Sequence, residues 1–492
     1  MIKFVKIWLR SAVSGPLVVA ILLYLGTTVV SAASGEKHWY DGFWPLGDRV
    51  PVKALKDEYI PFQSTPEIPE RPPLFLELGD GFLDIGNLSG GFEVPIIGAV
   101  WQPRLWSYMI NRTALQSFDN NVEGRERDSE LANRLDLFVN LQLTGTEKIL
   151  LGLRPTDNNL PGRFTKHSWS GSNEDTDNEL NTDIEVLFFE GDLGSLIPNL
   201  DPAGTTALDF GFTVGRQPIN FQEGIIVNDT VDMIGFVRNN MVFPHTSNFR
   251  ISGMWAWDRL DRNDRSRSAD ANMYGLFTFA DAHAGTYNLD MIYVEDNTSV
   301  SGDGLYIGAA SIQRIRSLGG ISTAFRINHS AALDNEISGN VIGDGTLLSA
   351  EFSRLVHGSD DILYFNPFWS IGNFTQAGRE AILGGPLGSL GILFASPNLS
   401  TYGAEISPFT DEVVGFATGY QAFWNNNRKN LILEVAGRHD TGAANGFDSL
   451  GVGFQFQQAV GQNFQLQPEA FYTLNAGERN SAGARFEFLF VY

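Results

Sequence analysis

Apolar and polar residues alternate along most of the chain after residue 100. The segment RLDLFVNLQL places Leu135 and Leu137 on one face of an extended chain and Arg134 on the other. The same pattern recurs in LDFGFTV, NFRISGMWAWD, YNLDMIYV, SLGVGFQFQQ and FQLQPEAFY. Alternation with a period of two predicts β-strands with one apolar and one partly polar face.

The chain ends in SAGARFEFLFVY, where Phe486, Phe488 and Phe490 alternate with Arg485 and Glu487. Chain ends tend to fray, so a terminal strand with this apolar face needs an apolar partner. A soluble β-sandwich can alternate in the same way. Many strands of about ten residues with aromatic residues near their ends are typical of outer-membrane barrels, whose outer face meets lipid.

The connections between these segments alternate in length. Counted back from Tyr492, a long LNAGERNSAG precedes a short VGQN, a long HDTGAANG, a short NNNRKN and a very long stretch from about 371 to 412. Short periplasmic turns and long external loops are typical of outer-membrane barrels. The pattern therefore predicts that residues 99–492 form an all-β fold. We expect a transmembrane antiparallel up-and-down β-barrel of about 18 strands, with 16 as the alternative.

The first 33 residues have the order of a secretory signal peptide. Lys3, Lys6 and Arg10 precede the apolar run PLVVAILLYLGTTVV, which ends in the small residues SAAS. We expect cleavage near Ala33. The alternative is an N-terminal membrane anchor, although the run is barely long enough to span a bilayer. Residues 34–98, rich in proline and glycine, predict a periplasmic segment that either plugs the lumen or remains a tail.

Composition and charge argue against several classes of function. The 492 residues include no cysteine, which excludes disulfides, thiolate metal sites and a cysteine nucleophile. With 34 Lys+Arg against 57 Asp+Glu, the net charge of −23 argues against nucleic-acid binding. The sequence contains no G-x-S-x-G, H-E-x-x-H, phosphate-loop or dinucleotide motif. We therefore expect no enzyme, no catalytic residue, no cofactor and no metal site.

A polar, glycine-containing stretch follows a predicted strand that ends at Val214. Its opening, VGRQPINF, is similar to a strand end in the alginate-export family of outer-membrane barrels. The resemblance implies an eighteen-stranded barrel with an arginine-lined pore, a constriction at Arg216 and a loop that folds toward the lumen. The acidity of the chain departs from a pore for polyanionic alginate, so that substrate is not implied. In the alternative, Arg216 only pairs with a neighbouring carboxylate of the lumen.

The alternation also assigns side chains to the two faces of the barrel wall. We expect Leu137, Phe210, Trp255 and Phe488 to face lipid. A barrel of about eighteen strands is too wide for side chains to fill, so charges on its wall and on an inward loop would set selectivity. The residues expected to line the pore are Arg134, Arg216, Arg238, Arg250, Arg326, Glu434 and Arg485.

These expectations converge on a porin-type channel of the bacterial outer membrane for passive diffusion of small hydrophilic solutes. The expected partners are outer-membrane lipid and lipopolysaccharide, the small solutes, and the barrel-assembly machinery, which would recognise the aromatic C-terminal strand. The alternative is a non-conducting barrel that acts as an adhesin, a scaffold or an assembly partner.

Overall fold

The computed structural model describes residues 74–82, 91–119, 127–157, 164–170, 176–200, 202, 208–263, 267–268, 270–296, 302–315, 320–333, 341–380, 384–390, 393, 399, 402–403, 406–442, 448–476 and 479–492. The expected signal peptide of residues 1–33 and most of the 34–98 segment lie outside these ranges. Among the described residues, no helix combines the length and the apolar character needed to cross a membrane.

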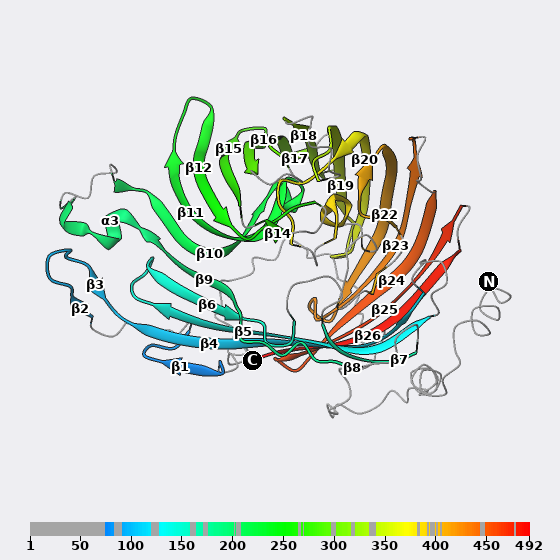
Figure 1. The fold of residues 1–492 in the computed structure, drawn as a ribbon, viewed down its shortest axis with the longest axis horizontal. Coiled ribbons are helices and arrows are strands. Elements are labelled where there is room, and N and C mark those ends of the chain that lie inside the picture. The colour runs from blue at the N-terminus through cyan, green and yellow to red at the C-terminus, as the bar shows by residue number, and fades with distance from the viewer. Residues whose placement is uncertain are drawn as a thin grey trace.

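Antiparallel strands form a closed barrel of 18 strands (Figure 1). In chain order the strands are β4 (Arg104–Phe118), β5 (Asp128–Gln142), β6 (Lys148–Leu153), β9 (Ile184–Asp192), β10 (Gly211–Phe221), β11 (Val227–Met241), β12 (Thr246–Asp258), β15 (Ala271–Ala282), β16 (Gly285–Asp296), β17 (Gly304–Ile315), β18 (Ile321–Ala332), β19 (Gly345–Leu355), β20 (Ile362–Phe374), β22 (Val413–Trp424), β23 (Lys429–Asp440), β24 (Ser449–Val460), β25 (Phe464–Asn475) and β26 (Ser481–Val491). The predicted fold class and strand number are confirmed.

The C-terminal strand closes the barrel by pairing with the first wall strand. β26 pairs with β4 from Gly483 opposite Phe118 to Val491 opposite Ile110. Tyr492 extends the seam, because it exchanges backbone hydrogen bonds of 2.7 and 3.0 Å with Met109. Closure leaves the wall without a free edge, so its backbone groups are paired within the sheet.

Shorter elements flank the barrel strands. They are β1 (Leu76–Leu78), β2 (Phe92–Glu93), β3 (Val100–Trp101), β7 (Thr165–Ser170), β8 (Thr176–Asp177), α3 (Leu193–Leu196), η1 (Pro198–Leu200), η3 (Gln222–Gly224), β13 (Leu260–Asp261), β14 (Arg267–Ser268), η6 (Pro386–Leu390) and β21 (Thr410–Asp411). β1 pairs with the start of β4, and the ring of Phe82 meets Trp106 edge-on at 5.1 Å. The described residues of the 34–98 segment therefore dock at this end of the wall.

The two faces of the wall differ as the alternation predicts. Apolar side chains such as Leu289, Trp255 and Phe488 are 59%, 45% and 39% exposed on the outer face. The neighbouring positions on the same strands, such as Asp290 and Glu487, are buried on the inner face. The outer face is therefore apolar, and the inner face carries the charge.

The hairpin β10–β11 leaves the wall partway along its length. β10 pairs with β9 from Gly211 to Arg216, and β11 pairs with β12 from Asp232 onward. Residues 217–231 have no wall neighbour among the described strands, although β10 and β11 stay paired with each other up to Phe221 opposite Val227. We call residues 217–231 the inner hairpin. The prediction that the residues after Val214 form a loop is thus wrong, since these residues form strands and a short turn.

Gly215 marks the point where the hairpin separates from β9. Its φ is +122°, and an added Cβ would lie 2.3 Å from the carbonyl oxygen of Leu187. A side chain is therefore excluded both by backbone conformation and by space. Glycine here lets the two backbones stay close while the chain turns.

We predict that Gly215→Ala destabilises the folded barrel by about 1–3 kcal/mol, the range for strained backbone positions. Gly253→Ala is the matched control, because the nearest atom to its added Cβ is 4.0 Å away. The unfolding temperatures of the two refolded variants are compared by heating each sample and monitoring the change in its gel mobility. Equal unfolding temperatures for both variants would contradict the role of Gly215.

Candidate functional site

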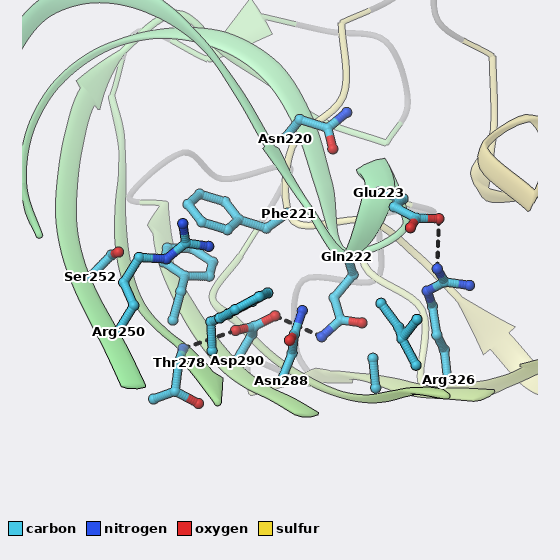
Figure 2. A pocket seen from close by; sticks show the side chains of 14 residues that line it. Asn220, Phe221, Gln222, Glu223, Arg250, Ser252, Thr278, Asn288, Asp290 and Arg326 are labelled. Carbon is cyan, nitrogen blue, oxygen red and sulfur yellow. Dashed lines mark hydrogen bonds and ion pairs between the residues drawn. The ribbon is translucent and has the colours of Figure 1, made fainter. Parts of the chain in front are cut away.

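The tip of the inner hairpin rests on the inner wall of β16 and β18 (Figure 2). Gln222 donates from Nε2 to the carboxylate of Asp290 at 2.6 Å. Glu223 forms an ion pair of 2.6 Å with Arg326, which also pairs with Glu351. Both tip residues have left-handed backbone angles, with φ of 52° and 56°. Such angles are unfavourable for residues other than glycine, so the wall contacts hold the turn in this shape.

A second internal element covers the free edge of the inner hairpin. The backbone N–H of Asn228 donates to Gly378 at 3.0 Å, and Glu380 and Ala377 donate to Asn228 and Ile226 at 2.9 Å each. The side chain of Gln376 also donates to the carbonyl of Gly224. These bonds satisfy backbone groups that the hairpin lost when it left the wall.

This element belongs to the connection between β20 and β22, of which residues 375–380, 384–390, 393, 399, 402–403 and 406–412 are described; we call it the inner segment. Its apolar residues Leu387, Tyr402 and Ile406 are each at most 1% exposed. They cluster with Phe118 of β4 and Phe471 of β25, on opposite sides of the β26 strand. The prediction of a purely external loop over 371–412 is wrong, because these apolar side chains pack inside the barrel.

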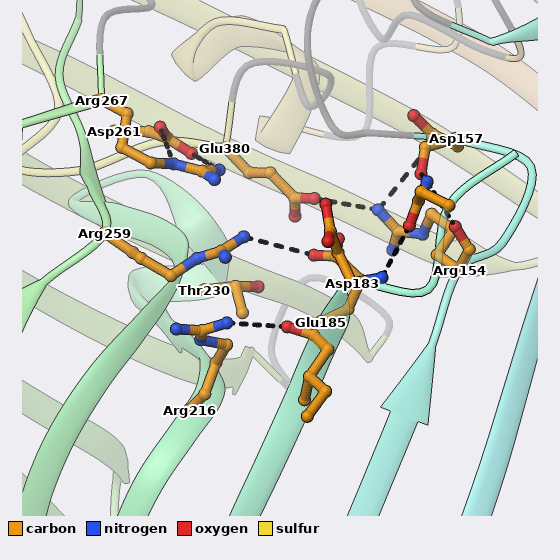
Figure 3. Close-up of polar contacts among 12 residues, drawn as sticks. Arg154, Asp157, Asp183, Glu185, Arg216, Thr230, Arg259, Asp261, Arg267 and Glu380 are labelled. Carbon is orange, nitrogen blue, oxygen red and sulfur yellow. Dashed lines mark hydrogen bonds and ion pairs between the residues drawn. The ribbon is translucent and has the colours of Figure 1, made fainter. Parts of the chain in front are cut away.

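Arginines and carboxylates gather beside the base of the inner hairpin (Figure 3). Arg154 donates to Asp136 at 2.8 Å and to Glu380 of the inner segment at 3.1 Å. Arg259, just after β12, lies 3.5 Å from Glu185 of β9. These contacts join the inner segment and the wall strands on either side of the hairpin.

Carboxylates lie close together in the same region. Asp261 is held by Arg267 at 2.9 and 3.0 Å, and its backbone N–H donates to Asp229 at 2.8 Å. Burial raises the pKa of Asp261, and the hydrogen bonds from Arg267 oppose that shift. Burial lowers the pKa of Arg154, but the carboxylates of Glu380 and Asp136 outweigh burial and raise it. The region is thus a network of paired charges at the hairpin base.

Several residues expected to line the pore lie on the inner face. They are Arg134, Arg250, Arg326, Glu434 and Arg485. Arg250 is exposed there, with its guanidinium 4.7 Å from the centre of the Phe279 ring. Arg134 pairs with Asp136 at 2.9 Å on the same strand.

The remaining inner-face residues of that set are covered by the internal elements. Glu434 accepts hydrogen bonds from Leu393 of the inner segment at 2.9 Å and from Tyr364 at 2.5 Å. Arg485 is 3% exposed and lies 5.1 Å from the ring centre of Tyr402. Arg326 is 2% exposed and clasped by the hairpin tip. These charges therefore anchor the lumen elements to the wall.

Arg216 lies at the base of the inner hairpin, and not at its tip. It donates to Asp232 at 2.7 and 2.9 Å and to the carbonyl of Ile184 at 2.8 Å. Its strand face is the one that carries Val214 and Ile234, which lie opposite each other in the wall. Arg216 thus pairs with a neighbouring carboxylate, as the alternative expected, but by register both side chains lie on the strand face of Ile234 and Trp255 and not on the lumen face.

Arg238 departs from the expectation that it faces the lumen. It lies opposite Ile251, on the strand face that also carries Trp255. Its guanidinium is 4.8 Å from the centre of the Phe210 ring, which places Phe210 on the outer face as expected. A long arginine side chain can cover an aromatic ring near a strand end while its charged group reaches polar surroundings. Arg238 also shares its strand face with Phe236, which is 48% exposed, so alternation within this strand agrees with its outward position.

A cavity of about 320 Å³ lies between the hairpin tip and the inner wall. Its lining combines aromatic, amide and charged side chains from β12, β15, β16 and the tip. Sequence reasoning missed Gln222, Glu223 and Asp290 in this role. The sequence did carry one signal for the tip: the amide and carboxylate side chains of Gln222 and Glu223 in FQEG, within the polar stretch that follows Val214. Asp290 alone carried no signal, since it reads as one more polar position of an alternating strand.

Comparisons with known proteins agree with this architecture. No protein-family model matches the sequence, and no curated protein matches it. The fold is similar to the crystal structure of OccAB3 from Acinetobacter baumannii, with a TM-score of 0.51 at 12% identity over 79% of this chain and 99% of that chain.

Further solved structures show the same likeness. OccAB4 from Acinetobacter baumannii matches with a TM-score of 0.52 at 9% identity over 78% of this chain and 97% of that chain. OccK2 (OpdF) from Pseudomonas aeruginosa matches with a TM-score of 0.51 at 10% identity over 79% and 97%. Identities this low show a shared fold alone. The resemblance to the alginate-export family stays a prediction.

We predict that Arg326→Gln loosens the hairpin tip, because Glu223 loses its partner and Glu351 is left beside it without the shared cation. Hydrogen–deuterium exchange of the amides of residues 222–226 should become about tenfold faster, equivalent to about 1.4 kcal/mol of lost docking free energy. Arg354→Gln, on an exposed arginine of the neighbouring strand β19, is the control. Unchanged exchange at the tip in Arg326→Gln would refute the anchoring contact.

Proposed function

We propose that this protein is a porin-type channel of the outer membrane for passive diffusion of small hydrophilic solutes. The observation that carries the proposal is the closed 18-stranded barrel with an apolar outer face and a charged inner face. Such a wall can meet hydrocarbon outside and water inside. The fold shared with the Occ channels supports the same conclusion.

The inner hairpin and the inner segment narrow the passage. Every solute would pass the hairpin tip, where few water molecules separate it from the charges of the wall. Of the expected pore-lining residues, Arg250 is the one with an exposed guanidinium beside the tip cavity. We assign it the main part in charge selectivity, with Arg326, Glu434 and Arg485 acting mainly through the position of the internal elements.

A non-conducting barrel is the second candidate, and the apolar packing of the inner segment favours it. Leu387, Leu390 and Tyr402 form a buried cluster with wall residues, so part of the lumen is filled. In that case the barrel would serve as an adhesin, a scaffold or an assembly partner. Conductance separates the two functions directly.

Export and assembly complete the proposal. Residues 1–33 would direct the chain across the inner membrane and be removed. The barrel-assembly machinery would recognise the aromatic terminal strand, in which Phe490 and Tyr492 stack at 6.0 Å. Lipid and lipopolysaccharide would then surround the apolar outer face.

We predict that the refolded protein conducts ions in planar bilayers and that Arg250→Ala shifts its reversal potential toward cations. The anion-to-cation permeability ratio should fall about twofold or more, because a unit charge at 4 Å contributes about 1 kcal/mol even in bulk water. Arg238→Ala is the matched control, since both guanidinium groups lie over phenylalanine rings at nearly equal distances, 4.7 and 4.8 Å, but on opposite faces.

The outcomes separate the alternatives. Absence of conductance in correctly folded protein would favour the non-conducting barrel. If the protein conducts and Arg250→Ala and Arg238→Ala shift the reversal potential equally, the charge of Arg250 on the inner face does not set the ion selectivity.

A further inference from the structure

The cavity beneath the hairpin tip has the features of a ligand site and not only those of a passage (Figure 2). Its volume of about 320 Å³ lies near the lower end of the ~300–1,000 Å³ of ligand pockets in proteins, so it fits one small molecule. It is built from separate parts of the chain: the tip on one side, and the inner faces of β12, β15 and β16 on the other. A solute in it would touch both the hairpin and the wall.

Aromatic rings form one side of the cavity. Phe221 of the hairpin lies parallel to Phe277 of β15, with ring centres 3.4 Å apart and an interplanar angle of 7°. Phe279, two residues further along β15, lies under the guanidinium of Arg250. Aromatic faces are apolar surfaces of fixed shape that pack against flat, apolar parts of a ligand.

Amide groups beside these rings supply the polar contacts, since Asn288 lies across from Phe279 in the β15–β16 pairing. Gln222 is 5% exposed and donates to Asp290, while its Oε1 is buried and accepts no hydrogen bond in the described structure. The Oδ1 of Asn288 is buried and likewise accepts none. Buried acceptors are costly when left without a donor. The pair therefore favours a ligand that brings hydroxyl or amino hydrogens into the cavity.

The charges around the cavity balance. Arg250 and Arg326 face it with positive charge, and Asp290 and Glu223 with negative charge. Arg326 is shared between Glu223, at 2.6 Å, and Glu351, which does not line the cavity. An anion would meet Asp290 and a cation would meet Arg250, so neither sign is favoured overall. A neutral ligand that both donates and accepts hydrogen bonds satisfies Arg250, Asn288 and Gln222 together.

We propose that this cavity binds a neutral, cyclic, polyhydroxylated solute of monosaccharide size. The apolar face of such a ring would pack on Phe221, and its hydroxyl groups would donate to Asn288 and Gln222 and accept from Arg250. The proposal deepens the proposed channel function, on which it rests, by naming the class of solute that the passage retains. The hairpin tip supplies one wall of the site, so docking of the tip and binding of the solute are linked.

The test uses D-glucose as the probe and the full refolded protein. Isothermal titration in detergent measures binding, and planar bilayers measure block of the ion current by added glucose. We expect saturable binding and a concentration-dependent reduction of current beyond the effect of glucose on the bulk solution. Asn288→Leu and Phe221→Ala should weaken both at least tenfold. Asn140→Leu, on the inner face of β5 away from the cavity, is the matched control and should change neither.

Potassium gluconate, a polyhydroxylated anion of similar size, is the competing probe. Tighter binding of gluconate than of glucose would overturn the proposal, as would glucose binding that survives in Asn288→Leu and Phe221→Ala. Conductance without glucose binding would leave the channel function intact and refute the solute class. Glucose binding without conductance would support the site and refute the channel.

Discussion

Pairing of backbone N–H and C=O groups is the constraint on which the architecture depends. The wall satisfies it by closing β26 onto β4, so that no edge strand remains. The inner hairpin breaks this pattern, because its residues give up their wall neighbours and would expose two free edges. The segment from Ala377 to Glu380 restores pairing on the β11 edge with three backbone hydrogen bonds of 2.9–3.0 Å. The constriction therefore exists because two distant parts of the chain fold into the lumen together.

Charge then fixes these internal elements in place. Removing the partner of a buried charge leaves that charge uncompensated, so the buried guanidinium of Arg326 requires its carboxylate partners in place. Arg326 fixes the hairpin tip to β18, and Arg154 ties Glu380 of the inner segment to Asp136 of the wall. Many of the charged residues of the lumen thus serve the shape of the passage. Exposed groups such as Arg250 are left to act on solutes.

The alternation of side chains made the wall predictable and left the lumen largely hidden. A two-residue period follows from strand geometry, so the fold class and the faces of Trp255 and Phe488 followed from it, and the alternating lengths of the connections predicted the strand number. Arg238 was misplaced because it was counted with the polar stretch after Val214, although it shares its strand face with the exposed Phe236. The constriction rests on contacts of high sequence separation, such as Gln222 with Asp290 and Asn228 with Gly378. Local patterns carry no information on such pairs.

The central claim is that the hairpin tip rests against the wall of β16 to β18 inside the barrel. A disulfide between Gln222→Cys and Gly308→Cys tests this contact, because an added Cβ at Gly308 lies 3.3 Å from Cγ of Gln222 and the chain has no cysteine of its own. The side-chain oxygen of Asn328, 2.6 Å from that Cβ, has to move aside. If the tip is docked, we expect near-complete cross-linking under mild oxidation, seen as a reducible shift in gel mobility. The control pair is Gln222→Cys with Gly451→Cys. Gly451 lies on β24 and faces Ile406 of the inner segment, so this pair should stay reduced. Absent cross-linking in the first pair, or equal cross-linking in both, would contradict the account.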